Sequence, residues 1–174
     1  AIEYYQLFKK HGASLKVTAL FDPNIDNNAG FELKMSGLTE ILEDYNQRYK
    51  QDFNLSSHGK FKKDIVARLA HKRPYERLEF TPEKQIDLLI VVDQMLTGFD
   101  SRWLNTLYLD KVLEYEQVIQ AFSRTNRLFG PDKPFGTIRY YRYPSSMERN
   151  IKDAVAMYSG NKPLALFAEQ LDYN

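Results

Sequence analysis

Two arginines and a glutamine follow one another at helical spacing in the second half of the chain. They are Gln120, Arg124 and Arg127. On a helix these positions lie within about 60° of one another, so all three side chains project from one stripe. Phosphoryl transfer spreads negative charge over the γ-phosphate oxygens, and a guanidinium offers fixed charge and a planar fork of donors that matches two of them. The spacing is therefore suited to phosphate chemistry, but taken by itself it more often marks a pair of surface arginines in ordinary ion pairs.

A loop with residue types suited to ligand binding precedes this segment. Thr97, Gly98 and Asp100 follow the apolar run that ends at Val92. In open α/β sheets, ligands bind beyond the carboxyl ends of the strands, where this loop is expected. Gly98 lets the backbone approach a ligand closely, and Asp100 is able to accept hydrogen bonds from ribose hydroxyls. By itself the loop also fits a strand-to-loop turn with a capping aspartate, but its combination with the arginines is more specific.

The elements that must position these residues alternate between strands and helices. Strand-like runs occupy Leu15–Phe21, Ile86–Val92, Thr106–Asp110 and Gly136–Tyr141, and helical periodicity covers Leu38–Tyr49, Phe61–Ala70 and Tyr115–Leu128. Ile86–Val92 is apolar on both faces, which is typical of a central strand. The alternation predicts an α/β fold with a largely parallel sheet and helices on both faces.

Two further helices are predicted after Pro144, over Met147–Tyr158 and Leu164–Leu171. We interpret them as the start of a helical appendage. The chain would then consist of a sheet domain at residues 1–143 and a C-terminal segment at residues 144–174. Because it begins with Ala1 and its opening residues lack the features of a signal peptide, we interpret it as a piece of a longer chain.

The composition excludes several classes of protein. With 174 residues, 43% of them hydrophobic, and a formal net charge of +1, the chain is able to bury a core. Its longest aliphatic run, Leu88–Val92, is far shorter than the roughly 20 apolar residues of a membrane span, so no membrane contact is expected. There is no cysteine and the three histidines are far apart. We therefore expect no metal site and a reducing, cytoplasmic environment.

The near-neutral total conceals two basic blocks. Residues 48–77 carry nine Lys and Arg against three Asp and Glu, and residues 118–152 carry seven against two. Such a block is a candidate contact surface for nucleic acid, and equally a solvated helix face with ordinary ion pairs.

Together these segments resemble the second RecA-like domain of superfamily-two helicases, with residues 93–100 in the place of motif V and residues 120–127 in the place of motif VI. More narrowly, the runs Leu88–Asp100, Leu104–Lys111 and Ile119–Arg127 resemble the motor (R) subunit of type I restriction enzymes. Shorter supporting stretches are Arg68–Arg73, Lys133–Ile138 and Ala156–Gly160. The resemblance extends from Phe61 to Gly160. A RecA-like fold is therefore expected.

The resemblance implies nucleotide contacts for five matched residues. Arg124 and Arg127 would contact the γ-phosphate of ATP, with Arg127 as the arginine finger. Gln120 would contact phosphate or the neighbouring domain. Gly98 and Asp100 would lie by the ribose.

The resemblance also implies DNA contacts and partners. Thr97 would face the nucleic acid, and Lys60, Lys62 and Lys63 are candidates for contacts with DNA phosphates, which are insensitive to base sequence. The complete subunit would translocate along double-stranded DNA before cleavage. It would carry a preceding RecA-like domain and a nuclease domain, and it would work with modification and specificity subunits.

Several parts of a complete motor are missing from the sequence. It contains no Gly-x-x-x-x-Gly-Lys-Ser/Thr loop, no Asp-Glu-x-His box and no nuclease constellation. We therefore expect half of an ATP site, with the Mg²⁺ ligands on the preceding RecA-like domain and no activity in the fragment alone. Phe-Ser before Arg124 and Thr-Asn after it depart from the commonest helicase pattern, which weakens any carry-over from RNA helicases.

Two other functions stay open. One is a different superfamily-two DNA helicase or translocase, which the flanking domains would distinguish. The other is a catalytically silent RecA-like module that serves as a protein-interaction surface, with its arginines in surface ion pairs.

Overall fold

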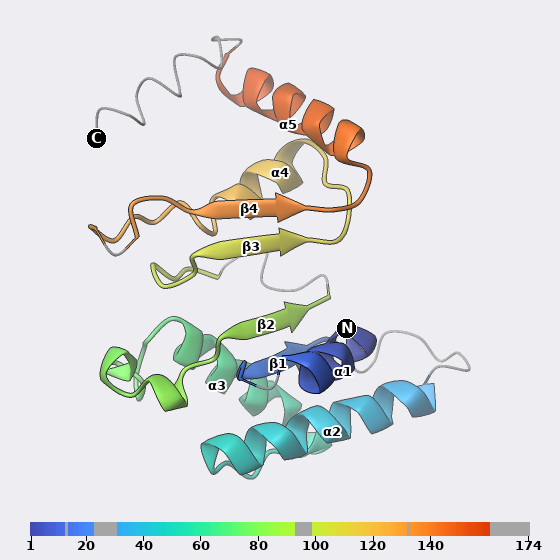
Figure 1. Cartoon of the computed structure of the whole chain (residues 1–174), viewed down its shortest axis with the longest axis vertical. Helices are drawn as coiled ribbons and strands as arrows, with labels where there is room; N and C mark the ends of the chain where they lie inside the picture. Colours follow the sequence, from blue (N-terminus) through green and yellow to red (C-terminus); the bar gives the residue numbers. More distant parts are fainter. Residues whose placement is uncertain (13, 23–30, 93–98, 132, 161–174) are drawn as a thin grey trace. The chain divides into compact units, whose positions relative to one another are not determined.

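The computed structural model describes residues 1–12, 14–22, 31–92, 99–131 and 133–160. The chain falls into two units, Ala1–Met95 and Leu96–Asn174. Each unit combines helices with one pair of parallel strands (Figure 1). The α/β class predicted from the sequence is therefore confirmed.

The first unit is built on the parallel pair β1 (Val17–Leu20) and β2 (Leu88–Val91). Its helices are α1 (Ile2–His11), α2 (Phe31–Tyr49) and α3 (His58–Leu69). Short 3₁₀ turns lie at Leu55–Ser57, Leu78–Phe80 and Pro82–Lys84. Helices α2 and α3 and both strands match predicted elements, whereas α1 was not predicted and α2 begins earlier than its periodicity indicated.

The core of the first unit forms where the apolar stripes of α2 and α3 meet β1. Leu38, Ile41 and Tyr45 on α2 are buried, as are Phe61 and Ile65 on α3. Burying a side chain of this size contributes about 1.5–3 kcal/mol. Most of the stability of both helices therefore comes from this shared core rather than from helix propensity.

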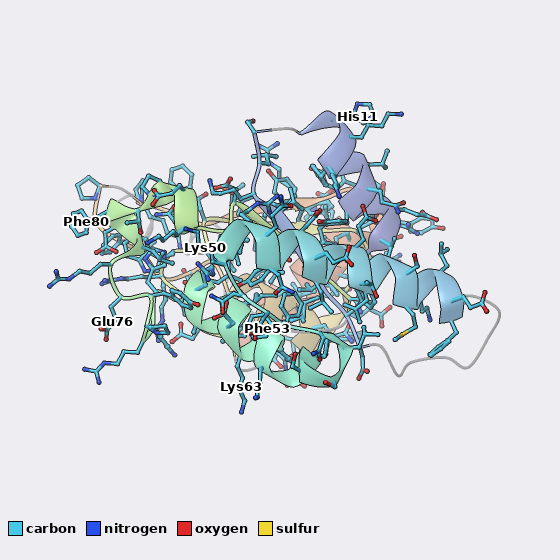
Figure 2. The ribbon with its side chains drawn as sticks, turned by 90° about the horizontal axis from the view of Figure 1, so that it is seen from below. His11, Lys50, Phe53, Lys63, Glu76 and Phe80 are labelled. Atoms are coloured by element: carbon cyan, nitrogen blue, oxygen red, sulfur yellow. The ribbon has the colours of Figure 1, made fainter. Side chains whose placement is uncertain are left out.

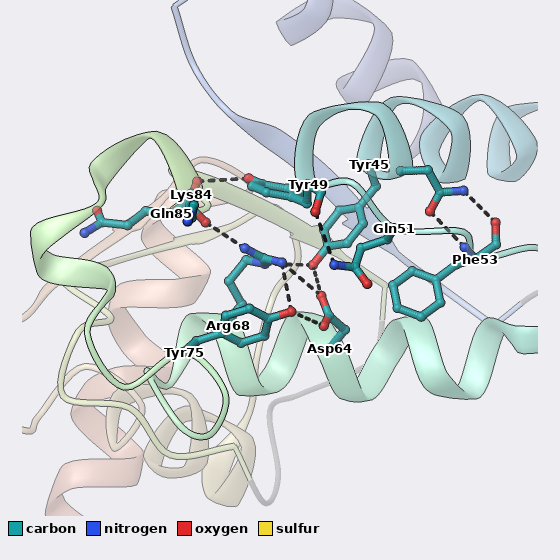
Figure 3. Close-up of polar contacts among 10 residues, drawn as sticks. Tyr45, Tyr49, Gln51, Phe53, Asp64, Arg68, Tyr75, Lys84 and Gln85 are labelled. Carbon is teal, nitrogen blue, oxygen red and sulfur yellow. Dashed lines mark hydrogen bonds and ion pairs between the residues drawn. The ribbon is translucent and has the colours of Figure 1, made fainter.

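A buried arginine organises the polar part of this core. The Arg68 guanidinium donates to the Lys84 carbonyl oxygen at 3.0 Å and to the hydroxyls of Tyr45 and Tyr75 at 3.1 and 3.0 Å (Figure 3). Asp64 accepts hydrogen bonds from both tyrosines and lies 3.4 Å from the guanidinium. Burial and the bond to Asp64 raise the pKa of Tyr75 to about 12. Because each of these groups has a partner, the core tolerates a buried charge.

The second unit contains β3 (Thr106–Leu109), α4 (Tyr115–Phe122), β4 (Thr137–Tyr140) and α5 (Pro144–Tyr158). Strands β3 and β4 pair in parallel, and α4 connects them along the chain. Figure 1 shows α4 behind the two strands and α5 next to α4. The core of this unit consists of Leu109, Leu113, Val118, Ala121, Met147 and Ala154.

The strand pairing predicted from the sequence is confirmed within each unit. Strand β1 pairs in parallel with β2, and β3 pairs in parallel with β4. That one sheet unites the four strands stays a prediction. Strand β2, predicted to be buried on both faces, is half-buried at all four residues. In β3, Leu109 is buried and Tyr108 is exposed, as expected for neighbours that point to opposite faces. Helices on both faces of the sheet stay a prediction.

Helix α5 belongs to the core of the second unit. It begins at Pro144, a favourable first position because proline lacks the N–H that a helix leaves unpaired there. The backbone N–H of Leu113 contacts the sulfur of Met147 at 3.5 Å, and Asn150 donates to the Leu113 carbonyl oxygen at 2.9 Å. The helix predicted at Met147–Tyr158 is confirmed. The domain boundary after residue 143 stays a prediction, and the helix predicted at Leu164–Leu171 lies outside the described residues.

Candidate functional site

Neither of the two arginines lies on a helix. Helix α4 ends at Phe122; Arg124 lies in the following turn and Arg127 in an irregular segment. The predicted helix to Leu128 is wrong, and with it the stripe shared by Gln120, Arg124 and Arg127.

Helix α4 ends here because side chains compete with the backbone for the Gln120 carbonyl oxygen. The Gln120 carbonyl oxygen accepts hydrogen bonds from the Ser123 hydroxyl at 2.7 Å and from Arg124 Nε at 3.0 Å. The backbone N–H of Arg124 bonds instead to Ala121, three residues earlier, at 3.1 Å. Side chains thus satisfy the carbonyl that the next helical turn would have used, and the helix closes in a tight turn.

Arg124 folds back onto the segment that precedes β3. Its Nη1 donates to the Phe99 carbonyl oxygen, and its Nη2 donates to Ser123 Oγ at 3.0 Å. With the Nε bond, the guanidinium uses three of its five N–H groups on neutral oxygens. Phe99 is buried, so this contact anchors the turn after α4 to a fixed point of the second unit.

Arg127 forms an ion pair with Asp100, which follows Gly98 by two residues. Arg127 Nη2 lies 2.6 Å from Asp100 Oδ2, and the side chains are 63% and 46% exposed. A pair this exposed contributes about 0–1 kcal/mol, so another anion is able to replace Asp100 as the partner of Arg127. Both arginines therefore contact the residues that follow Gly98. Thr97 and Gly98 themselves lie outside the described residues.

Gln120 makes its contact along its own helix. Its Nε2 donates to Glu116 Oε1 at 2.7 Å, one turn earlier on α4. The structure thus brings Arg124, Arg127 and Asp100 together around residues 99–100, whereas the observed partner of Gln120 is on α4.

Two buried residues, Thr125 and Lys133, hold the segment that bears Arg127, and neither is among the candidate residues predicted from the sequence. Thr125 is buried against Gly136, where an added Cβ would lie 2.4 Å from the Thr125 carbonyl oxygen. Lys133 is 4% exposed, and its Nζ donates to the Arg127 carbonyl oxygen at 2.6 Å. Burial lowers the pKa of Lys133. A glycine directly before a strand signals close backbone approach; no comparable signal marks Lys133.

Aromatic contacts also stabilise the residues that follow Arg127. The Phe129 ring lies 4.9 Å from the ring of Trp103, and the Arg102 guanidinium lies 4.4 Å from the centre of the Phe129 ring. A cation over an aromatic face contributes about 0.5–1 kcal/mol at an exposed site. These contacts join the loop after Arg127 to the segment after Asp100.

The candidate DNA-contacting lysines lie on α3, in the first unit. Lys60, Lys62 and Lys63 are exposed, and Figure 2 shows Lys63 pointing away from the helix. Phe61 and Ile65 of the same helix are buried. The lysines therefore occupy the solvent face of an amphipathic helix, where they are accessible to a ligand. Their role in DNA binding stays a prediction.

The described residues contain no group of three or more His, Asp or Glu side chains placed to hold a metal ion. None of their helices is both long enough and apolar enough to cross a membrane.

A sequence model for the family described as type I restriction enzyme subunit R domain 3 matches residues 1–143, which include every candidate residue named above. The chain belongs to this family. It is 34% identical, over 166 residues, to a type I restriction enzyme endonuclease subunit of Staphylococcus aureus strain COL; the match covers 91% of the chain and 17% of that relative. The corresponding subunit of Staphylococcus saprophyticus is 36% identical over 167 residues, with the same coverage.

A shorter match extends the R-subunit family to another genus. The N-terminal part of a putative type I restriction enzyme endonuclease subunit of Mycoplasma pneumoniae is 48% identical over 69 residues, which make up 40% of the chain and 18% of that relative. The chain spans about 17% of the length of the staphylococcal R-subunit relatives. The resemblance inferred from residues 88–127 is thus confirmed at the level of the family.

Proposed function

We propose that this chain is the second RecA-like domain of an ATP-driven DNA motor in a type I restriction R subunit, and that it supplies the arginine half of the ATP site. One observation carries the proposal. Arg124 contacts Phe99 and Arg127 contacts Asp100, so the segments that resemble motifs VI and V lie against each other. Membership of the R-subunit family favours this function over that of another superfamily-two motor.

In the proposed site, Arg127 acts on the γ-phosphate. ATP binds at the preceding RecA-like domain, and closure of the two domains brings the Arg127 guanidinium to the triphosphate. Its fixed charge and paired donors stabilise the negative charge that spreads over the phosphoryl oxygens during transfer. The side chain is 63% exposed and therefore accessible to a nucleotide held by another domain.

Asp100 and Arg127 are each assigned to ATP, so their mutual ion pair must separate when the nucleotide binds. The separation costs little, because an exposed pair is worth about 0–1 kcal/mol. Once Arg127 turns to the phosphate, the Asp100 carboxylate is free to accept hydrogen bonds from the ribose hydroxyls.

Arg124 has a different position. Its three bonds to Gln120, Phe99 and Ser123 fix the guanidinium plane. Its remaining N–H groups contact the γ-phosphate from this fixed position. We assign Gly98 to the ribose and Gln120 to phosphate or to the neighbouring domain, as the family resemblance implies.

The rest of the ATP site lies on the preceding domain. Mg²⁺, held by carboxylates there, would neutralise phosphate charge.

ATP turnover drives movement along double-stranded DNA. Both RecA-like domains grip the duplex, closure follows ATP binding and opening follows hydrolysis, so that each cycle becomes a step. Lys60, Lys62 and Lys63 contact DNA phosphates, and Thr97 faces the nucleic acid. Modification and specificity subunits select the site, and a nuclease domain elsewhere in the subunit cleaves the DNA after translocation.

The test is the ATP turnover of an intact R subunit that carries Arg127→Ala, assembled with its partner subunits and DNA. An arginine finger predicts a loss on the order of 10³-fold. Arg142→Ala is the matched control, because Arg142 forms a similarly exposed pair with Asp110 at 2.8 Å, with side chains 60% and 38% exposed. Equal turnover in both variants would assign Arg127 to an ordinary surface ion pair.

A catalytically silent interaction module is the second candidate. It is favoured by the fact that both arginines already have partners within the second unit. Wild-type turnover in Arg127→Ala, with normal assembly of the subunits, would support this candidate and refute the proposed catalytic role.

A further inference from the structure

Lys133 is a buried cation in an unusual position. It is 4% exposed, and among the described residues no carboxylate forms an ion pair with it. Its Nζ donates to the Arg127 carbonyl oxygen at 2.6 Å. Taking an ammonium group out of water costs stability unless the interactions it makes offset the lost hydration. The position of this ammonium group is therefore better explained by what it holds than by its contribution to stability.

The local backbone fixes the lysine in this position. The Phe129 N–H donates to the Lys133 carbonyl oxygen at 3.0 Å, and the Lys133 N–H donates back to the Phe129 carbonyl oxygen at 3.2 Å. This reciprocal pair holds the backbone of Lys133 next to that of Phe129, two residues after Arg127. From this position the buried side chain reaches the Arg127 carbonyl oxygen.

Arg127 requires such support because it lies outside regular secondary structure. No helical or strand hydrogen bond fixes its backbone in the described structure, since α4 ends five residues earlier. The direction of its Cα–Cβ bond depends on the orientation of its own peptide group. The ammonium bonded to that carbonyl controls this orientation, while the guanidinium stays accessible.

We infer that Lys133 is a positioning residue for Arg127, whose backbone it holds so that the guanidinium is presented in the geometry that phosphoryl transfer requires. The inference rests on the proposed role of Arg127 at ATP. Lys133 itself does not touch the nucleotide. Its removal should lower the rate of the chemical step more than it weakens ATP binding, because a displacement of 1 Å costs up to about 10²-fold in rate.

The experiment measures kcat and KM for ATP in the intact R subunit, assembled with its partner subunits and DNA. Lys133→Met removes the donor and keeps a long apolar side chain suited to burial. We expect kcat to fall by about 10–10²-fold, with KM changed less than about threefold. Lys133→Arg, which keeps a cation and its N–H donors, should recover most of the loss. Lys152→Met is the matched control at an exposed position of α5 and should behave as wild type.

A double variant separates positioning from a general structural effect. If Lys133 acts through Arg127, Arg127→Ala combined with Lys133→Met should be no slower than Arg127→Ala alone, because the group being positioned is already gone. If Lys133→Met fails to fold, Lys133→Gln takes its place. Its amide nitrogen lies one bond closer to Cα than Nζ and falls short of the Arg127 carbonyl oxygen, so the same expectations apply.

Three outcomes would overturn the inference: a wild-type kcat in Lys133→Met, a loss of equal size in both Arg127 backgrounds, or a defect confined to KM. A slow Arg127→Ala variant beside a normal Lys133→Met variant would refute the role of Lys133 alone. Normal turnover in Arg127→Ala would instead refute the proposed function.

Discussion

Replacing Gly136 with alanine tests whether packing beneath the arginines holds them in place. The added Cβ would lie 2.4 Å from the Thr125 carbonyl oxygen and 2.6 Å from its Cβ, whereas ordinary contacts begin at 3.4 Å. Residues 125 and 136 must therefore move apart by about 1 Å, which lowers activity by up to about 10²-fold when it misplaces a group needed for the reaction. The displaced atoms are backbone and β-carbon atoms, which a rotamer change cannot relieve.

The expected cost to stability lies near the upper end for overpacked sites. We predict that Gly136→Ala lowers the free energy of unfolding by about 3 kcal/mol, and the melting temperature by roughly 6–12 °C. Thermal unfolding of the 174-residue chain followed by circular dichroism checks this value. Gly59→Ala is the control, because no atom lies within 4 Å of the added Cβ on α3; it should stabilise the chain by about 0.5–1 kcal/mol.

The same variant tests the link from packing to activity. Thr125 lies between Arg124 and Arg127, so an intact R subunit with Gly136→Ala should turn over ATP about 10²-fold more slowly at a temperature where it is folded. An unchanged melting temperature would refute the close packing of Gly136 against Thr125. A lower melting temperature with normal turnover would refute the claim that this packing positions the arginines.

Three further predictions concern the first unit. Arg68→Met should lower the free energy of unfolding by about 3–5 kcal/mol, because it leaves the Asp64 carboxylate without its cation. Adding Asp64→Asn should recover part of this loss, as measured by urea unfolding. Equal free energies for the single and double variants would contradict this prediction. Because the folded state raises the pKa of Tyr75 from 10.0 to about 12, the stability linked to its protonation is complete below pH 10 and is lost between pH 10 and pH 12. Unfolding measured across this range should therefore depend less steeply on pH in Tyr75→Phe, and an identical slope would refute the shift. Replacing Lys60, Lys62 and Lys63 with glutamine in the intact subunit should reduce the slope of log affinity for DNA against log salt by about 0.9 for each lost phosphate contact, measured by fluorescence anisotropy, whereas an unchanged slope would remove these lysines from the DNA surface.

Local spacing was sufficient to predict the elements whose buried face lies within one helix or strand. Leu38, Ile41 and Tyr45 recur at helical spacing, and all three are buried on α2. The same reasoning located α3, α5 and the four strands to within a few residues. It succeeded because the burial of one face is a property of neighbouring residues and requires no knowledge of distant ones.

The end of α4 depends on contacts that periodicity does not detect. The bonds from Ser123 and Arg124 to the Gln120 carbonyl stop the helix, although the apolar pattern continues to Leu128. Arg124 then bonds to Phe99, 25 residues earlier in the chain. The candidate residues themselves could thus be predicted from the sequence, but the backbone conformation and the contacts that position their side chains could not.

Other features of the fold depend on partners far apart in sequence. Helix α1, which no pattern predicted, is tied to α2 by Tyr5 and Lys9, which both contact Asp44. The two separate strand pairs likewise follow from pairing between distant segments. Pairing of this kind is decided by tertiary packing, which the preferences of a single segment do not report.

The most direct test of the central claim is whether Arg127 is required for an intact R subunit to trap ADP with aluminium fluoride, which mimics the phosphoryl group in transfer. A group that acts in the transition state should strengthen this complex much more than it strengthens binding of ADP alone. The account predicts that the wild-type subunit and Arg142→Ala retain the complex, whereas Arg127→Ala binds ADP normally and loses the complex. Retention of the complex by Arg127→Ala, at wild-type affinity, would contradict the account.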